Sequence, residues 1–506
     1  MKIQEFLKHH GIARNPFAEE DAQTDIVFKN HCIENTFHVG WDKVFGNPSD
    51  PSTSIVFGEK GAGKTALMLQ ITQHVNQHNR ASPKGKLYLI DYDDFNPFLD
   101  RFRDHFGSRF RRADKLLGAW RLWDHMDAIL SQGVTRLTDQ FLDPAEEAGV
   151  SKALVRSMPR HLRRDALLLA ACYDQSKNES LPVRWQALRS RLGFWTWKAK
   201  IPFQLGIFGV LIAAALFAAT KWVELGNVPE GLPERFTVPN IPWWVYAIIL
   251  GLAWLPWIWK AANRTWLAHA VTRKYRVGKR YTNPLRRVLM NFTNRDLLGQ
   301  PFPNKDRTDD RYELLGKLQN VVEHLGYSGV LVLMDRLDEP HLINGQAELM
   351  RAFLWPILDN KFLKHPGVGV KMMLPIELRR FVDREDRDFY QRARLDKQNM
   401  IPSLQWTGAA LYDLANSRIT AVAADGKSPS LRSLFDESVT DQRLIEGFQA
   451  LRVPRQLFKF LYRLLVAHCN AYTDQNATWE ITNHVFESVL AVYAKEIEAA
   501  DAGVGV

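Results

Sequence analysis

The chain has 506 residues, 46% of them hydrophobic and 24% charged, a composition that allows a sizeable core and excludes a chain disordered throughout. Its net charge of +10 is compatible with nucleic acid or an anionic membrane as a partner. Cys32, Cys172 and Cys469 are too far apart for a zinc or redox motif, so we expect free buried thiols in a reducing compartment. The N-terminal residues MKIQEFLKHHGIARNPF lack the apolar region of a signal peptide, and we expect them in the cytoplasm.

The first motif is a glycine-rich segment between an apolar stretch at 55–57 and a helical pattern that begins near Lys64. Residues 58–65 read GEKGAGKT and fit the Walker A pattern GxxxxGK[ST]. Glycines let backbone N–H groups turn around a phosphate, and the following helix directs its N-terminal dipole at the anion. We expect Lys64 to reach the β- and γ-phosphates and the Thr65 hydroxyl to ligate Mg²⁺. The residues expected to contact the nucleotide are Gly58, Glu59, Lys60, Gly61, Ala62, Gly63, Lys64, Thr65 and Ala66. The alternative is a turn of the same shape that binds no nucleotide.

Residues 86–91, KLYLID, predict a second strand. The stretch from Arg101 to Arg121 that follows is basic, with Arg103, Arg109, Arg111 and Arg112 interleaved with aromatic residues. This stretch is either a solvated helix face, which we favour, or a contact for a polyanion.

Two apolar stretches lie in the middle of the chain, at 201–220 and 241–259, and neither contains a charge. Each has close to the ~20 residues that a helix needs to cross the hydrocarbon of a bilayer. The second carries tryptophans towards both ends, as in the aromatic belts of membrane helices, and the first is rich in Gly and Ala, which suits close helix contact. We predict transmembrane helices at about 202–220 and 241–259; the alternative is a pair of buried helices in a soluble core.

The charges around these stretches predict their orientation. Basic residues precede the first stretch and follow the second, whereas the linker 221–240 carries more acidic than basic residues. We therefore expect an integral protein of the inner (cytoplasmic) membrane with both termini in the cytoplasm. The basic run from Lys260 to Arg295 is expected to attract anionic lipid rather than nucleic acid, by about 1 kcal/mol per residue near the surface.

A second motif follows at 330–340, which reads VLVLMDRLDEP. Its five apolar residues predict a strand buried on both faces, and Asp335 comes at its carboxyl end, where ligands of parallel sheets bind. We assign Asp335 as the Walker B acid on the Mg²⁺ side, and Asp338 and Glu339 as further catalytic acids, with Glu339 polarising the attacking water. The alternative is a charged surface loop after a core strand.

Residues 368–374 and 400–406 predict further strands, and the alternation with helical patterns predicts an α/β fold with a parallel, doubly wound sheet. We expect four parts: the first half of the nucleotide domain at 1–100, a helical insertion with the membrane helices at 101–310, the second half at 311–410 with Walker B at 330–339, and a C-terminal helical lid at 411–506. Because the membrane hairpin separates the two motifs, both halves must meet on the same side of the bilayer. Pro454 is expected at a helix N-terminus, followed by Arg455.

A Walker A motif and a Walker B motif separated by paired transmembrane helices resemble the KAP family of P-loop NTPases. The family's Walker B usually reads DDLDR, whereas this chain has DRLDE, whose trailing Asp-Glu resembles NACHT, other STAND-class and AAA+ proteins. The segment VPRQLFKFLYRLL is similar to the AAA+ helical lid, which implies that Arg455 senses the γ-phosphate. Arginine fingers are expected among Arg379, Arg380, Arg392 and Arg394.

The motifs predict an ATPase that uses Mg²⁺ and ATP as a conformational switch on the cytoplasmic face. The resemblance implies signalling or defence against phage or plasmids, a homo-oligomer, and a protein partner or effector. Alternatives are a membrane-tethered ATPase that handles nucleic acid, for which the sequence has no binding motif, and a transporter, for which two uncharged spans offer no substrate path.

Overall fold

The computed structural model describes residues 1–34, 36–82, 84–107, 112–143, 150–175, 179–224, 241–358, 361–393, 395, 399–473 and 476–501. The chain divides into two compact units. The first comprises Met1–Asn96, Phe110–Trp120 and Gly326–Val506, and the second comprises Pro97–Arg109 and Arg121–Leu325. The first unit is therefore assembled from segments on both sides of the second in the sequence.

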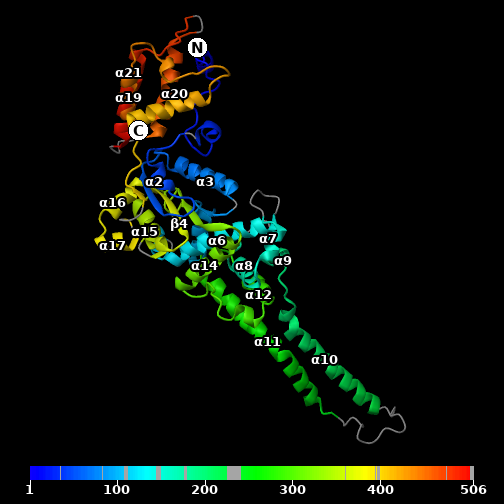
Figure 1. The fold of residues 1–506 in the computed structure, drawn as a ribbon. Coiled ribbons are helices and arrows are strands. Elements are labelled where there is room, and N and C mark those ends of the chain that lie inside the picture. Colours follow the sequence, from blue (N-terminus) through cyan, green and yellow to red (C-terminus); the bar gives the residue numbers. More distant parts are fainter. Residues whose placement is uncertain are drawn as a thin grey trace. The chain divides into compact units, whose positions relative to one another are not determined.

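The first unit contains a five-stranded parallel sheet with the order β2-β3-β4-β1-β5. Its middle strand, β4, is labelled in Figure 1. Its strands are β1 (Ser54–Gly58), β2 (Lys86–Tyr92), β3 (Tyr327–Met334), β4 (Val368–Pro375) and β5 (Asn399–Ile401). The predicted strands are confirmed, but the last is shorter than the predicted 400–406. Pro402 follows Ile401 directly and has no N–H to donate to the ladder, which accounts for the early end of β5.

The central strands are buried on both faces, as expected for a parallel sheet covered by helices. All residues of β1 and β4 are buried, including Lys371. The Lys371 ammonium donates to the carbonyl oxygens of Val44 at 2.7 Å and Phe45 at 3.1 Å, and to the Ser52 hydroxyl at 3.2 Å. Burial lowers the pKa of Lys371 to about 7.

Helices make up the rest of the first unit. They are α1 (Ile3–His9), α2 (Trp41–Phe45), α3 (Lys64–Ala81), α5 (Ala113–Gly118), α15 (Ala347–Leu358), α16 (Arg379–Val382), α17 (Arg387–Ala393), α18 (Gly408–Ala421), α19 (Asp441–Gln449), α20 (Pro454–Ala471) and α21 (Asn483–Asp501). The last four share one hydrophobic core with α1, centred on Phe6, Leu411, Phe448 and Phe460. The helices predicted near the C-terminus are thus confirmed, and Pro454 is the first residue of α20.

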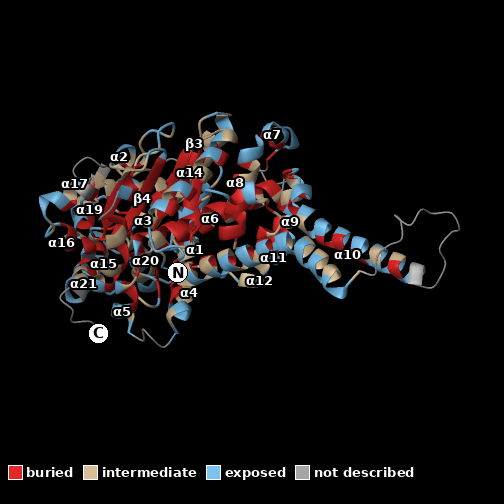
Figure 2. Cartoon of the chain, turned by 90° about the horizontal axis from the view of Figure 1, so that it is seen from below, coloured by how far each residue is buried: buried red, intermediate tan, exposed pale blue. Residues whose placement is uncertain are grey.

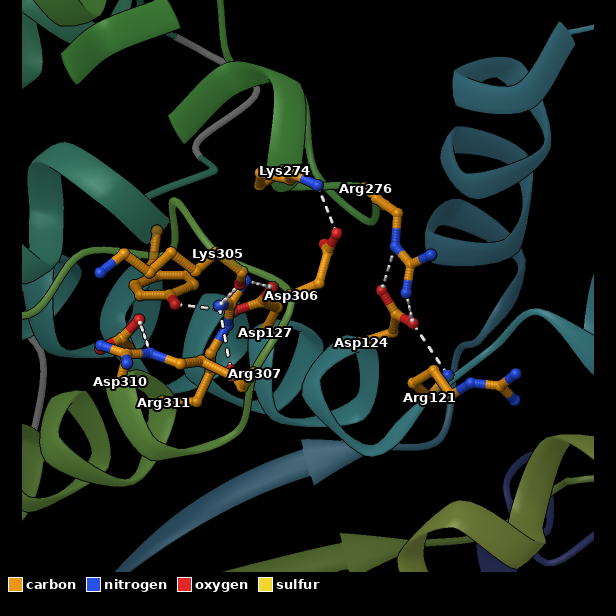
Figure 3. A network of polar contacts seen from close by, with 11 residues as sticks. Arg121, Asp124, Asp127, Lys274, Arg276, Lys305, Asp306, Arg307, Asp310 and Arg311 are labelled. Atoms are coloured by element: carbon orange, nitrogen blue, oxygen red, sulfur yellow. Dashed lines mark hydrogen bonds and ion pairs between the residues drawn. The ribbon is translucent and has the colours of Figure 1, made fainter. Parts of the chain in front are cut away.

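The second unit is helical in its described residues. Besides most of α4 (Asn96–Phe106), it contains α6 (Leu122–Leu142), α7 (Lys152–Ser157), α8 (Arg160–Tyr173), α9 (Leu181–Arg191), α10 (Trp197–Glu224), α11 (Trp243–Lys274), α12 (Thr282–Leu289), α13 (Asn294–Leu297) and α14 (Asp309–His324). Buried ion pairs join these helices (Figure 3). Asp127 of α6 and Arg311 of α14 are 0% exposed and form a two-point ion pair, with both N···O distances 3.1 Å. The Tyr173 hydroxyl donates to the same carboxylate at 2.7 Å.

Helices α10 and α11 are long and apolar enough to cross a membrane. In the most apolar 18 residues of each helix, 17% of the α10 residues and 6% of the α11 residues are buried. Figure 2 shows exposed and intermediate residues along both helices. A core helix of a soluble domain would be mostly buried, so the exposure favours the membrane interpretation. The two helices pack on each other where Gly206 and Gly209 of α10 meet Trp254 and Ala253 of α11.

Both helices extend beyond the predicted spans: α10 begins at Trp197 and runs to Glu224, and α11 runs past residue 259. Helix α11 does not end near Trp259 but continues through the basic residues to Lys274. Four cations of the basic run are bound inside the second unit. Lys260 donates to the carbonyl oxygens of Ala199 and Met290, and Arg264 donates to the Asn294 side chain. Arg276 binds Asp124, and Arg280 donates to the carbonyl oxygens of Cys172 and Asp174. The charge available to lipid is therefore smaller than the sequence indicates. In the other basic stretch, Arg103 pairs with Asp100 and Arg112 with Asp114, while Arg109 and Arg111 lie outside the described residues.

Candidate functional site

The segment 58–65, called here the glycine loop, connects β1 to α3. Gly61 and Gly63 have φ of +89° and +96°, in the left-handed region that disfavours other residues. The loop therefore turns sharply at the carboxyl edge of the sheet. Its last two residues, Lys64 and Thr65, begin the 18-residue helix α3, whose first-turn backbone N–H groups and dipole favour an anion.

The Lys64 side chain folds back over this loop. Its ammonium donates to the carbonyl oxygens of Gly58 at 2.7 Å and Glu59 at 2.9 Å. Burial lowers the pKa of Lys64, and the negative charges of Asp338 and then Asp335 oppose that shift. The ammonium is thus held at the mouth of the loop by two neutral acceptors, which a phosphate oxygen can replace with a stronger, charge-assisted hydrogen bond.

Thr65 and Asp335 meet although 270 positions separate them in the sequence. The Thr65 hydroxyl donates to the Asp335 carboxylate at 2.8 Å. This meeting follows from the sheet order, because β4 pairs with both β1 and β3 and so brings the carboxyl ends of all three strands to one edge. Asp335 is 4% exposed, and burial raises its pKa against the opposing hydrogen bonds from Thr65 and the Arg336 backbone.

The residues after Asp335 form a tight acidic turn. Arg336 has φ of +60°, and the Glu339 N–H donates to the Arg336 carbonyl oxygen at 3.2 Å. Burial raises the pKa of Glu339, while the Arg336 guanidinium, 3.9 Å from its carboxylate, acts in the opposite direction. Asp338 and Glu339 line the same cavity as Lys64, Thr65 and Asp335.

Arg455 also reaches the glycine loop. Its backbone N–H, in the first turn of α20, donates to the Gly61 carbonyl oxygen at 3.3 Å. Its side chain lines the cavity, and its Nε atom is buried without a hydrogen-bond partner among the described residues. An unsatisfied buried donor is costly and rare, so this atom marks Arg455 as a residue whose hydrogen bonding is incomplete beside the cavity.

Of the four expected arginine fingers, Arg379 and Arg380 are described, and neither lines this cavity. Arg379 donates to the Pro402 carbonyl oxygen and pairs with Asp383, and the Arg380 guanidinium lies over the Phe381 ring. The side chain of Arg392 and the whole of Arg394 lie outside the described part of the chain.

Several residues of the cavity carry no motif and were missed by the sequence analysis. The Trp406 indole N–H donates to the Ala62 carbonyl oxygen at 2.9 Å, and the His38 ring lies edge-on to the indole at 5.0 Å. Arg418 and Asp25 form a buried ion pair at 2.6 Å that also lines the cavity. These residues come from three separate segments whose proximity is a property of the fold, so no local sequence signal was present to find them.

The oxygen atoms at the glycine loop fit Mg²⁺ better than a metal that needs several protein ligands. No group of three or more His, Cys, Asp or Glu side chains is placed to hold a metal within the described residues. Thr65 and Asp335 offer two hard oxygen ligands, which fits Mg²⁺ because this ion usually takes one or two protein oxygens together with phosphates and water. Comparison of the chain with protein-family models, curated proteins and solved structures found no match, so the argument for its function comes from this geometry.

Proposed function

We propose that this protein is a membrane-anchored P-loop ATPase, in which the glycine loop binds the phosphates of ATP and the acidic turn after β3 supports hydrolysis. The observation that carries the proposal is the hydrogen bond from Thr65 to Asp335. These are the hydroxyl and the carboxylate that a P-loop enzyme uses at its metal, and they come from the two predicted motifs. A parallel, doubly wound sheet would place them as observed.

Phosphate binding follows from the groups around the glycine loop. The left-handed glycines and the start of α3 supply backbone N–H groups, and Lys64 supplies a positive charge. Phosphate oxygens would replace the two carbonyl oxygens that now hold the ammonium. Thr65 and Asp335 would hold Mg²⁺, which when bound neutralises charge on the phosphates.

Hydrolysis needs a group that orients water towards the γ-phosphate. Glu339 suits this role because it lines the cavity, and partial desolvation raises its pKa although its side chain is 62% exposed. A raised pKa makes its carboxylate a better proton acceptor than that of an ordinary glutamate. Asp338 is half-buried beside it and helps to keep Lys64 charged. Arg455, in the first turn of α20, would contact the γ-phosphate. The position of the C-terminal helices would then depend on whether a γ-phosphate is bound.

The test is turnover of Mg²⁺-ATP by the purified full-length protein in detergent or in vesicles. Lys64→Ala should abolish nucleotide binding, and Glu339→Gln should retain binding but stop hydrolysis. Glu348→Gln, an exposed glutamate outside the cavity, serves as the matched control and should keep wild-type activity. Normal hydrolysis by Glu339→Gln would show that this residue is not the base, and nucleotide binding by Lys64→Ala at wild-type affinity would refute the site itself.

A further inference from the structure

The cavity at the glycine loop continues beyond the residues that phosphate binding needs. Its lining includes Ala66, Leu67 and Gln70, so it follows the first two turns of α3. From Thr65 to Gln70 the helix rises about 7 to 8 Å. A triphosphate on the loop therefore leaves room along α3 for the rest of a nucleotide.

The part of this cavity lined by residues outside the two motifs, called here the aromatic end, has walls from three segments. Phe28, Cys32, Thr36 and His38 come from the N-terminal segment, Trp406 from the loop after β5, and Phe458 from α20. Gln70 of α3 fixes the first wall, because its side-chain amide donates to the carbonyl oxygens of Thr36 at 2.6 Å and Ile33 at 3.3 Å. The aromatic end is thus built around the helix that starts at the glycine loop.

The local backbone supports a binding role for this wall. Phe28–Cys32 forms a π-helix, a conformation that is rare and often found at functional sites. Asp25 stabilises it by accepting from the Phe28 N–H at 3.0 Å while it pairs with Arg418. The irregular turn places both Phe28 and Cys32 at the cavity.

Trp406 lies at the junction between the aromatic end and the glycine loop. Its N–H is used by the Ala62 carbonyl oxygen, and a Cβ on Gly63 would lie 3.9 Å from the edge of the indole. The His38 ring packs against it and is fixed in turn, since its Nε2 atom bonds to the Gln405 carbonyl oxygen at 2.8 Å. The indole is therefore held rigidly beside the loop while it remains partly exposed to the cavity.

We propose that the aromatic end receives the base of the bound nucleotide and that Trp406 is the surface on which the base stacks. A flat, rigid indole beside a phosphate-binding loop suits a nucleobase, because aromatic stacking needs only a π-face and little reorganisation. The site would thus be specific for nucleotides over inorganic polyphosphates. The inference rests on the proposed phosphate site and adds to it the residues that recognise the base.

The experiment compares binding of ATP with binding of inorganic tripolyphosphate, which has no base, to the full-length protein. Trp406→Ala should weaken ATP binding about 5- to 150-fold, the range for loss of one stacked base, and leave tripolyphosphate binding within about threefold. Trp406→Phe keeps a ring but loses the N–H, so it should retain most of the ATP affinity. Tyr462→Ala, an exposed aromatic outside the cavity, is the control and should leave both affinities unchanged.

The outcomes separate this inference from the function on which it rests. If the wild-type protein binds neither ligand, the proposed phosphate site fails and the base site fails with it. If the wild type binds both but Trp406→Ala weakens both equally, Trp406 acts only by holding Ala62 in the glycine loop, and the base-stacking role is refuted. Equal ATP affinity in wild type and Trp406→Ala would refute it as well.

Discussion

A single added methyl group tests the contact between the glycine loop and α20. A Cβ on Gly61 would lie 2.6 Å from Arg455 Cβ and 3.1 Å from its Cδ, so Gly61→Ala must displace the first turn of α20. A non-glycine residue in the left-handed region costs about 1–2 kcal/mol. Overpacking costs about 1–3 kcal/mol more. We expect Gly61→Ala to lower the free energy of unfolding by about 2–5 kcal/mol, the sum of these two terms.

Gly85 provides a matched control for the backbone cost. Its φ is +81°, close to that of Gly61, but a Cβ there would meet no atom within 4 Å. Gly85→Ala should therefore cost only the first contribution, about 1–2 kcal/mol. Arg455→Gly removes the Cβ atom with which an alanine at position 61 would clash. The double variant should therefore recover the steric part of the lost unfolding free energy.

The assay is urea unfolding of the detergent-solubilised protein, followed by tryptophan fluorescence, together with ATP binding. Gly61→Ala should be less stable than Gly85→Ala and should bind ATP more weakly, whereas Gly85→Ala should bind normally. If the two variants are equally stable, Gly61 does not contact Arg455 as described, and the argument that α20 responds to the nucleotide loses its basis.

Three further variants probe other parts of the chain. Asp127→Asn should cost about 3–5 kcal/mol in urea unfolding because it leaves the Arg311 charge buried without its partner, and Asp127→Leu with Arg311→Met should recover much of that loss. Lys371 has a pKa of about 7 in the folded protein, whereas in the unfolded chain it stays protonated up to about pH 10. Between these pH values the unfolded state binds more protons, so the free energy of unfolding should rise with pH. Lys371→Met should remove this rise in thermal melts recorded from about pH 7 to 9. Gly209→Leu, whose Cβ would lie 2.2 Å from Ala253, should separate α10 from α11 and lower the melting temperature in vesicles, whereas Gly251→Leu, with no atom within 4 Å, should not.

Much of the sheet was predictable because a parallel sheet imposes a strong local signal. Strands covered on both faces read as short apolar runs, as VLVLM does before Asp335. The position of Asp335 at the carboxyl end of that run follows from the same rule, which explains how a residue so distant from Thr65 could be chosen from the sequence. The glycine pattern identified the loop that carries Thr65, because residues other than glycine rarely tolerate the φ of Gly61 and Gly63.

The parts that were not predictable depend on partners far away in the chain. The basic run after the second apolar stretch looked like a membrane-surface cluster, yet Lys260 is bound by carbonyl oxygens of Ala199 and Met290. Nothing local distinguishes a lysine that faces lipid headgroups from one that is bound inside the protein. The extension of α11 was missed for a related reason: apolar length defines a membrane span, whereas Ala, Lys and Arg continue a helix beyond it at no cost.

The topology also explains how a large helical unit can interrupt this sheet without disturbing the site. The chain leaves from the carboxyl end of β2 and returns at the amino end of β3. Because these strands are parallel neighbours, the insertion starts and finishes at opposite ends of the strand pair, about 20 Å apart. The entropic cost of closing such an insertion grows only with the logarithm of its length, so a long one is tolerated almost as well as a short one. In the described sheet β2 is an edge strand, and the pairings that align Thr65 with Asp335 run through β1, β4 and β3. The insertion therefore follows an edge strand in the sequence and leaves the pairing of β1, β4 and β3 unbroken, and the chain returns from it directly to the strand that ends before Asp335.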